Sequence, residues 1–234
     1  MSTEKARAGI LEENTRRRQE VESGLYAPWQ PAEIFMKSGR LRDAAALLRR
    51  QGLFPREGCR VLEVGCGEGG WLPDLLGWRL AARDLFGVDF DPRRLIAAAR
   101  RLPGCHFFAA DGAALPFADA AFDFTLGSTV FSSLLEPGLQ EKVAREIVRV
   151  LRPGGAHIHY DLAIDNPGNR QVRGLTAGRV RELFPSLHFA GRSTTLAPPL
   201  CRRIAPLSPA LASALESLPF LRSHLVAVLH KSSG

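Results

Sequence analysis

The feature that most constrains this chain is a glycine-rich turn, Gly65-Cys66-Gly67-Glu68-Gly69-Gly70, directly after the apolar run VLEV (61–64). The run predicts a buried strand, and glycines let the backbone approach a ligand and direct N–H groups at it. Asp89 ends the next apolar run, 22 positions after Gly67. An acid placed there can accept both hydroxyl hydrogens of a ribose. The order of strand, glycines, helix, strand and acid therefore predicts a site for a nucleoside-containing cofactor.

Two kinds of nucleoside cofactor fit this pattern. The spacing Gly65-x-Gly67-x-x-Gly70 also matches a dinucleotide fingerprint. Glu63, two residues before the turn, would repel a pyrophosphate but suits a ligand that carries ammonium and sulfonium cations. Asp111 follows the third apolar run and offers an acceptor for an adenine amine. These acids favour the sulfonium ligand, and a nicotinamide dinucleotide stays as an alternative.

Short apolar strands alternate with helical segments from residue 59 onward. Strands are expected at 59–66, 85–90, 106–110, 123–128, 156–162, 188–196 and 223–231. Between them, Asp91 and Pro92 predict the start of a helix, and Thr176 predicts another. This alternation predicts an α/β fold, a parallel sheet with helices on both faces.

The flanks of this pattern suggest a division of the chain. Residues 1–55 are expected to form an N-terminal helical cap or lid, with an amphipathic helix within 39–54. Residues 56–234 would form the main domain, and the proline-rich segment 197–222 would be a partly helical insert before the last strand.

Composition limits the partners and the location that we expect. The net charge is +7, yet only four of the 31 basic residues are lysines, and the arginines are scattered along the chain. We interpret this as coding bias, so a nucleic-acid partner is not favoured. There is no CxxC pair, no apolar run near 20 residues and no apolar signal segment at the start. A cytoplasmic protein without a metal site or membrane span is expected, of open oligomeric state.

Five motifs then give a family resemblance. VLEVGCGEGG, FGVDFD, AADGAALPF, FDFTLGS and VLRPGG, in this order, resemble the motifs of class I S-adenosylmethionine-dependent methyltransferases over about residues 59–162. The resemblance implies a Rossmann-like, seven-stranded, mostly parallel sheet whose last strand is antiparallel. The tail bears a faint similarity to uncharacterised bacterial methyltransferases found with surface-glycan genes.

The resemblance also implies S-adenosyl-L-methionine as cofactor and a set of residues around it. Asp89 would bind the ribose, Asp111 the adenine amine, and Glu63 would orient the loop or reach the methionine amine through water. Phe90, Asp111 and Ser128 also have ordinary structural explanations, as core or turn residues. The implied cofactor contacts are Glu63, Gly65, Cys66, Gly67, Asp89, Phe90, Asp111, Gly112, Ala113, Gly127 and Ser128.

The acceptor would lie over the carboxyl ends of the central strands. Asp161 falls at the end of the fifth expected strand and is the candidate general base, with Tyr160 beside it as a second catalytic candidate. Asp165-Asn166 resembles part of a magnesium site, but the fourth strand is followed by no acid, so no metal is expected. The expected reaction is O-methylation of a small-molecule or glycan acceptor. An RNA-binding methyltransferase or RNA-binding module, an NAD(P)-dependent oxidoreductase and an inactive cofactor-binding scaffold stay as alternatives.

Overall fold

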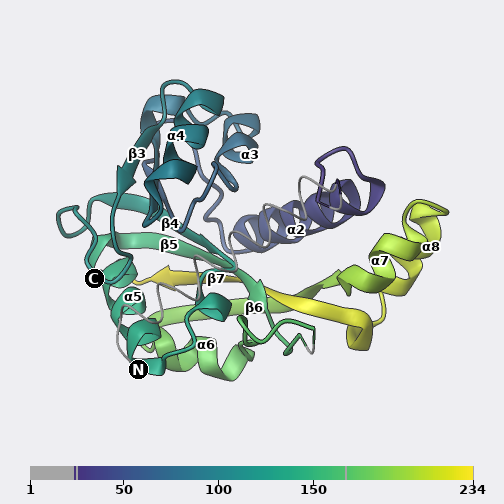
Figure 1. Cartoon of the computed structure of the whole chain (residues 1–234). Coiled ribbons are helices and arrows are strands. Elements are labelled where there is room, and N and C mark those ends of the chain that lie inside the picture. Colours follow the sequence, from purple (N-terminus) through teal and green to yellow (C-terminus); the bar gives the residue numbers. More distant parts are fainter. Residues whose placement is uncertain (1–23, 25, 167, 234) are drawn as a thin grey trace.

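The computed structural model describes residues 24, 26–166 and 168–233, and its strands form one sheet (Figure 1). The strands are β1 (Val61–Val64), β2 (Leu85–Asp89), β3 (His106–Ala109), β4 (Phe122–Ser128), β5 (Leu151–Leu162), β6 (Leu187–Leu196) and β7 (Arg222–Lys231). Their order in the sheet is β3-β2-β1-β4-β5-β7-β6. The first five strands pair in parallel, and β7 runs antiparallel to both of its neighbours. The expected seven-stranded sheet with an antiparallel last strand is confirmed.

Helices connect these strands and cover the sheet. The α-helices of the described residues are α2 (Pro31–Arg50), α3 (Leu72–Gly77), α4 (Pro92–Arg101), α5 (Pro137–Val150), α6 (Ala177–Leu183), α7 (Pro198–Ile204) and α8 (Pro209–Glu216). The 3-10 helices are η1 (Ala82–Asp84), η2 (Phe131–Ser133) and η3 (Pro219–Leu221). Among the described helices, none is long and apolar enough to cross a membrane.

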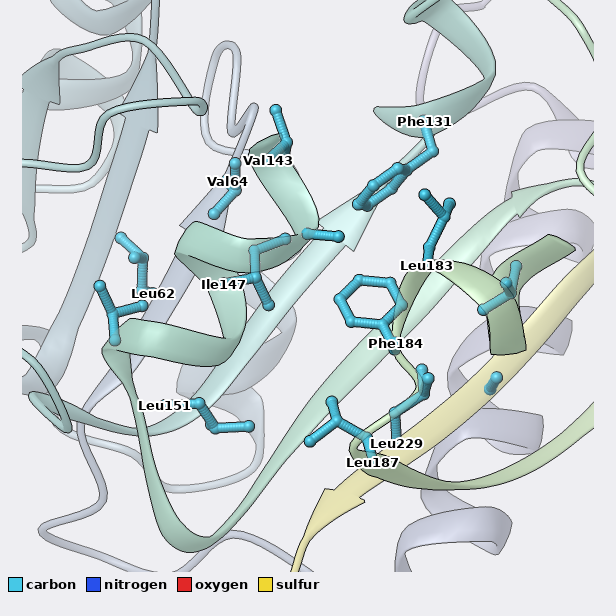
Figure 2. Packing of buried hydrophobic residues seen from close by; sticks show 14 of the residues in the cluster. Leu62, Val64, Phe131, Val143, Ile147, Leu151, Leu183, Phe184, Leu187 and Leu229 are labelled. Carbon is cyan, nitrogen blue, oxygen red and sulfur yellow. The ribbon is translucent and has the colours of Figure 1, made fainter. Parts of the chain in front are cut away.

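The alternation of side chains along the strands builds a core on each face of the sheet. Leu62 of β1 packs with Ile147 of α5 and Phe184 after α6 on one face (Figure 2). Val61, the preceding residue, packs on the other face with helices α2 and α3. Apolar side chains that point to opposite faces in turn are typical of a sheet buried on both sides. Glu63 and Tyr160 share the face of α2 and α3, whereas Asp161 faces η2 and α6.

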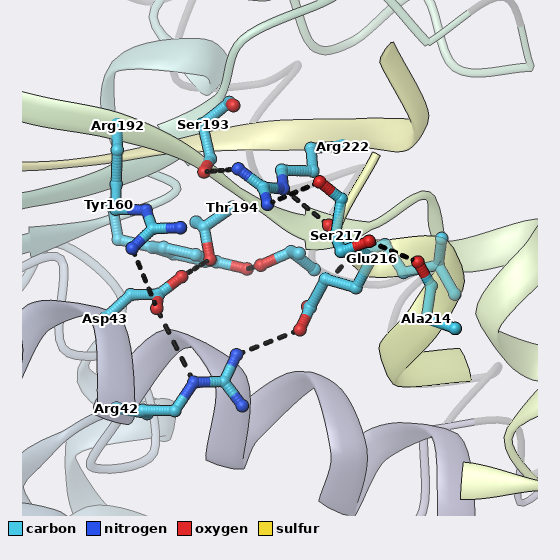
Figure 3. Close-up of polar contacts among 12 residues, drawn as sticks. Arg42, Asp43, Tyr160, Arg192, Ser193, Thr194, Ala214, Glu216, Ser217 and Arg222 are labelled. Carbon is cyan, nitrogen blue, oxygen red and sulfur yellow. Dashed lines mark hydrogen bonds and ion pairs between the residues drawn. The ribbon is translucent and has the colours of Figure 1, made fainter. Parts of the chain in front are cut away.

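A third apolar cluster joins α7 and α8 to the first half of α2 and the end of β6. Polar contacts strengthen this junction (Figure 3). Asp43 on α2 accepts a hydrogen bond of 2.6 Å from the Thr194 hydroxyl on β6, and Arg42 pairs with Glu216 on α8 at 2.9 Å. We call α7, α8 and η3 the C-terminal lobe; its two α-helices project from the end of β6 in Figure 1.

Helix positions largely follow the sequence signals. The Asp91 carboxylate accepts from Arg93 N at 3.0 Å and caps α4, and the Thr176 hydroxyl accepts from Arg179 N at 3.2 Å and caps α6. Helix α2 begins at Pro31, earlier than the expected segment 39–54, because a proline suits the first helical turn. The expected cap also includes residues 1–23, which lie outside the described residues, so the division at residue 55 stays a prediction.

One strand boundary differs from the expectation. Strand β5 begins at Leu151, before the expected start at residue 156, although Pro153 and two glycines follow Leu151 and are typical of a turn. Gly154 takes a φ of +76°, and the pairing with β4 shifts register between Phe122 and Phe124. A glycine-dependent irregularity therefore carries the chain from α5 straight into β5.

Candidate functional site

The glycine turn adopts a backbone that only glycine takes easily. Gly65 has a φ of +69° and Gly67 a φ of +54°, both in the left-handed region. A Cβ on Gly65 would stand 2.7 Å from Val130 Cγ2, and one on Gly67 would collide with the Arg94 guanidinium. Both glycines are therefore required by conformation, and Gly65 by space as well, whereas the flexible Arg94 side chain can move away from residue 67. The loop keeps a bare backbone at the carboxyl end of β1.

Asp89 ties this loop to the end of β2. Its Oδ2 accepts a hydrogen bond of 2.8 Å from Gly67 N, and its Oδ1 accepts one of 3.0 Å from Asp91 N. Arg94 Nη1 lies 3.5 Å from the same Oδ2. Carboxylate oxygens have about four lone-pair sites between them, so two N–H donors leave acceptor capacity for a ligand hydroxyl. The acid and the glycines that the sequence paired are thus in direct contact.

This junction lies where the order of strands reverses. Strand β1 has β2 on one side and β4 on the other, so the chain leaves the centre of the sheet in opposite directions. In open α/β sheets, ligands bind outside the carboxyl ends of strands at such a switch point. The loop, Asp89 and the end of β4 all meet there.

Glu63 lies beneath the loop and is buried. Its two carboxylate oxygens stand 3.1 and 3.0 Å from Trp71 N, which lies at the start of α3. Burial raises the pKa of the Glu63 carboxyl to about 8. A Cβ on Gly70 would collide with this carboxylate. Glu63 therefore orients the turn and the start of α3, and its contact with a cofactor amine stays a prediction.

Four of the expected residues lie at the carboxyl ends of β2 and β3. Phe90, Asp111, Gly112 and Ala113 are half-buried there. Asp111 Oδ1 accepts from Ala113 N at 2.9 Å and so closes a turn. Cys66 differs from them because its side chain is buried under the loop, and burial raises the pKa of its thiol. The Cys66 side chain therefore packs in the interior, and Cys66 contributes only its backbone to the loop surface.

The ends of β4 and β5 form the other half of the site. Ser128 is paired with Tyr160 across these strands, and Gly127 precedes it beside the buried His157 ring. Thr129 N donates to the Tyr160 carbonyl at 2.8 Å, and Thr129 has a φ of +54°. A β-branched residue rarely adopts this conformation, and such strain concentrates at functional sites.

The two catalytic candidates lie on opposite faces of β5. Asp161 accepts from Ser132 N at 3.1 Å and from Leu162 N at 2.9 Å, and burial raises its pKa to about 6. The Tyr160 hydroxyl shares a 2.9 Å hydrogen bond with Thr195 Oγ1, and burial raises its pKa to about 12. The two side chains therefore do not form a pair. Asp161 alone has a basicity suited to proton transfer near neutral pH.

The alternation of side chains along β5 puts His157 and His159 on the same face as Asp161, and both are fully buried. The Nδ1 of His157 lies 3.0 Å from Thr125 Oγ1. Burial lowers the pKa of His159 to about 4, so this ring is neutral at physiological pH. Both rings therefore pack in the core.

Sequence reasoning missed Arg40 on α2. Its guanidinium carbon lies 4.8 Å from the centre of the Trp71 ring and 5.5 Å from that of Tyr160. The Arg40 Nε is buried and has no hydrogen-bond partner among the described residues. The Arg40 charge also lowers the pKa of Glu63 in part, against the larger effect of burial. A cation thus stands beside the loop, although no local signal distinguishes Arg40 from the other arginines.

The chain is similar in sequence to known proteins. Residues 61–155 match the model of a family described as "Methyltransferase domain". The chain is 37% identical over 128 residues to the phthiotriol/phenolphthiotriol dimycocerosates methyltransferase 1 of Mycobacterium ulcerans, covering 54% of this chain and 46% of that protein. It is 36% identical over 135 residues to the malonyl-[acyl-carrier protein] O-methyltransferase of Enterobacter lignolyticus, covering 56% of this chain and 49% of that protein. The chain thus matches about half the length of these relatives.

Solved structures extend the likeness in fold. A structure described as a SAM-dependent methyltransferase from Thermotoga maritima aligns with a TM-score of 0.62 at 20% sequence identity. The alignment covers 92% of this chain and 97% of that one. At this identity the likeness concerns the fold alone.

Proposed function

We propose that this chain, whose residues 61–155 match a methyltransferase domain, transfers a methyl group from S-adenosylmethionine to an oxygen atom of a small-molecule or glycan acceptor. The O-methyltransferase named among the relatives supports oxygen as the acceptor atom. The first-named relative acts on phthiotriol dimycocerosates, so its name points to a lipid and leaves the acceptor class open.

The observation that carries the proposal is the junction of loop and acid. Gly67 N donates to Asp89 at 2.8 Å in a turn that has no room for a Cβ, at the switch point of the sheet. A bare backbone next to a ribose-binding acid fits an adenosyl group. On the adenine side, Phe90 and Asp111 are half-buried, as the edge of a binding site requires.

The methionine end of the cofactor carries a carboxylate and an ammonium group, which would lie near Arg40 and Glu63. Arg40 would bind its carboxylate, because a guanidinium with an unpaired buried N–H needs an anionic acceptor. Glu63, whose pKa burial raises to about 8, would accept a hydrogen bond from its ammonium group directly or through water, because a bound cation favours the ionised carboxylate. When bound, the cofactor supplies a methyl group on a positively charged sulfur, which needs little further activation.

The protein would then position the acceptor and remove its proton. Ser128 and Thr129 at the end of β4 would flank the methyl group, and the hydrogen bond from Thr129 N to the Tyr160 carbonyl holds this edge in place. Asp161 would accept the proton of the acceptor hydroxyl, since its raised pKa of about 6 keeps it ionised yet basic at neutral pH. Opening of η2 would be needed to free its carboxylate.

Two measurements test this proposal. Calorimetry should detect binding of S-adenosylhomocysteine and no comparable binding of NAD. Incubation with labelled S-adenosylmethionine and a panel of hydroxylated acceptors should transfer label to oxygen. Tight NAD binding without a response to S-adenosylhomocysteine would instead support an oxidoreductase. Cofactor binding with no methylated acceptor would favour an inactive scaffold, and steeply salt-dependent RNA binding would favour the RNA alternative.

A further inference from the structure

Helix α8 and its flanking turns carry a row of exposed apolar side chains, which we call the apolar ridge: Leu207, Leu211, Leu218 and Phe220. Leu207 is 82% exposed and Phe220 79% exposed. From residue 204 to residue 221 the only charged residue is Glu216, and it is buried. In a chain in which 24% of residues are charged, this uncharged surface is unusual.

The inner face of α8 is already used. Ala212 and Leu215 pack toward Cys201 and Ala205 in the third apolar cluster. Leu211, one turn before Leu215, lies at the border of this face and is 48% exposed. The rest of the helix surface carries Ala210, Ser213 and Ala214 and no charge, whereas an exposed helix face is normally charged or polar. In Figure 1, α8 lies at the projecting end of the molecule, where no other described element covers its outer side.

The charges that border the ridge are positive. Arg203 is exposed and has no ion-pair partner among the described residues. Arg222 donates to the backbone carbonyls of Glu216, Ser193 and Ser217, so its charge is not neutralised there. The acids near the lobe are each paired with an arginine, in the pairs Arg202–Glu33 and Arg42–Glu216. An excess of positive charge therefore surrounds an uncharged ridge.

We propose that the apolar ridge docks on the surface of an anionic lipid membrane. Leu207 and Phe220 would enter the interfacial layer, and Arg203 and Arg222 would contact the negative headgroups. An apolar helix face beside basic residues is the combination that binds such surfaces. This inference goes beyond the proposed function, because it concerns where the protein binds and holds for any acceptor.

A second copy of the chain fits the ridge less well. A two-fold contact through α8 would bring the Arg203 and Arg222 side chains of one copy toward those of the other, and like charges oppose such a contact. A standard stable interface also buries about 800 Å² per partner, which is large for four side chains on a projecting helix. The membrane surface satisfies both the apolar ridge and its basic border.

The test uses the full-length protein and lipid vesicles. Co-sedimentation would be measured with vesicles of phosphatidylcholine alone and of phosphatidylcholine mixed with phosphatidylglycerol. The variants are the double substitution Leu207→Ser/Phe220→Ser and the charge variant Arg203→Gln. Ile96→Ser is the matched control, because Ile96 on α4 is 55% exposed but lies outside the ridge. Binding of S-adenosylhomocysteine checks that each variant is folded, and a melting curve serves if that ligand does not bind.

The proposal expects the wild type and the control to pellet with the anionic vesicles. The double variant should lose about tenfold or more of this binding, and Arg203→Gln should weaken it and reduce its salt dependence. Three results would overturn the proposal: no binding by the wild type, equal binding to neutral vesicles, or unchanged binding by the double variant. Sedimentation velocity without vesicles tests whether a second copy of the chain occupies the ridge. A dimer that is present in the wild type and lost in the double variant would assign the ridge to a second copy.

Discussion

Replacing Asp89 by alanine tests the cofactor site at its most connected residue. The substitution removes the acceptor expected for the ribose hydroxyls, a charge-assisted contact of roughly 1.5–3 kcal/mol. This corresponds to a dissociation constant for S-adenosylhomocysteine raised roughly 10- to 150-fold. It also frees Gly67 N, which Asp89 holds at 2.8 Å, so loss of loop order adds to the effect. Isothermal titration calorimetry measures the change directly.

Asp91→Ala is the matched control for this experiment. Both acids are buried at the carboxyl end of β2, but Asp91 caps α4 and pairs with Arg93. Its loss should lower the free energy of unfolding by about 0.5–2 kcal/mol and leave cofactor affinity near that of the wild type. If Asp89→Ala binds S-adenosylhomocysteine as tightly as the control does, the assignment of Asp89 to the ribose is refuted.

Four further predictions concern single residues. Gly67→Ala should weaken S-adenosylhomocysteine binding by about tenfold or more. Gly58 has a φ of +83° and open space around it, so Gly58→Ala should cost only about 1 kcal/mol of stability. Equal affinities of the two variants in calorimetry would contradict this. Arg40→Met should weaken S-adenosylhomocysteine about tenfold and leave adenosine, which has no carboxylate, unaffected; a parallel loss for both ligands would argue against a carboxylate contact. Folding raises the Glu63 pKa from 4.5 to about 8, so the contribution of Glu63 to stability is full below pH 4.5 and is lost as the pH rises toward 8. The free energy of unfolding in urea should therefore depend less on pH across this range in Glu63→Gln than in the wild type. An unchanged dependence on pH would refute the raised pKa. Asp161→Asn should reduce turnover roughly 100-fold with little change in cofactor affinity. The kcat of the wild type should rise with pH through about 6. A variant as active as the wild type would exclude Asp161 as the base.

Local signals predicted much of this fold. The strands alternate so regularly with capped helices that the parallel sheet follows from the pattern, and Asp91 and Thr176 start helices where their side chains reach the backbone. The start of β5 was missed because Pro153 and two glycines usually mark a turn. In the structure these residues form an irregular stretch within β5, between Leu151, which pairs with Phe122, and Ala156, which pairs with Phe124.

The site was predictable only where its residues are close in sequence. The contact between Gly67 and Asp89 follows from the strand–helix–strand unit that separates them. Arg40 comes from another helix and reaches the loop by tertiary packing, so no spacing in the sequence revealed it. The opposite orientations of Tyr160 and Asp161 do follow from the alternation of a strand. The engagement of Asp161 by η2 depends on the loop after β4, which no pattern specified.

A crystal structure with S-adenosylhomocysteine tests the central claim most directly. The ribose hydroxyls should lie within hydrogen-bonding distance of the Asp89 carboxylate and the methionine carboxylate beside Arg40, with the sulfur facing the ends of β4 and β5. A ligand bound elsewhere, or an empty loop at saturating concentration, would contradict it.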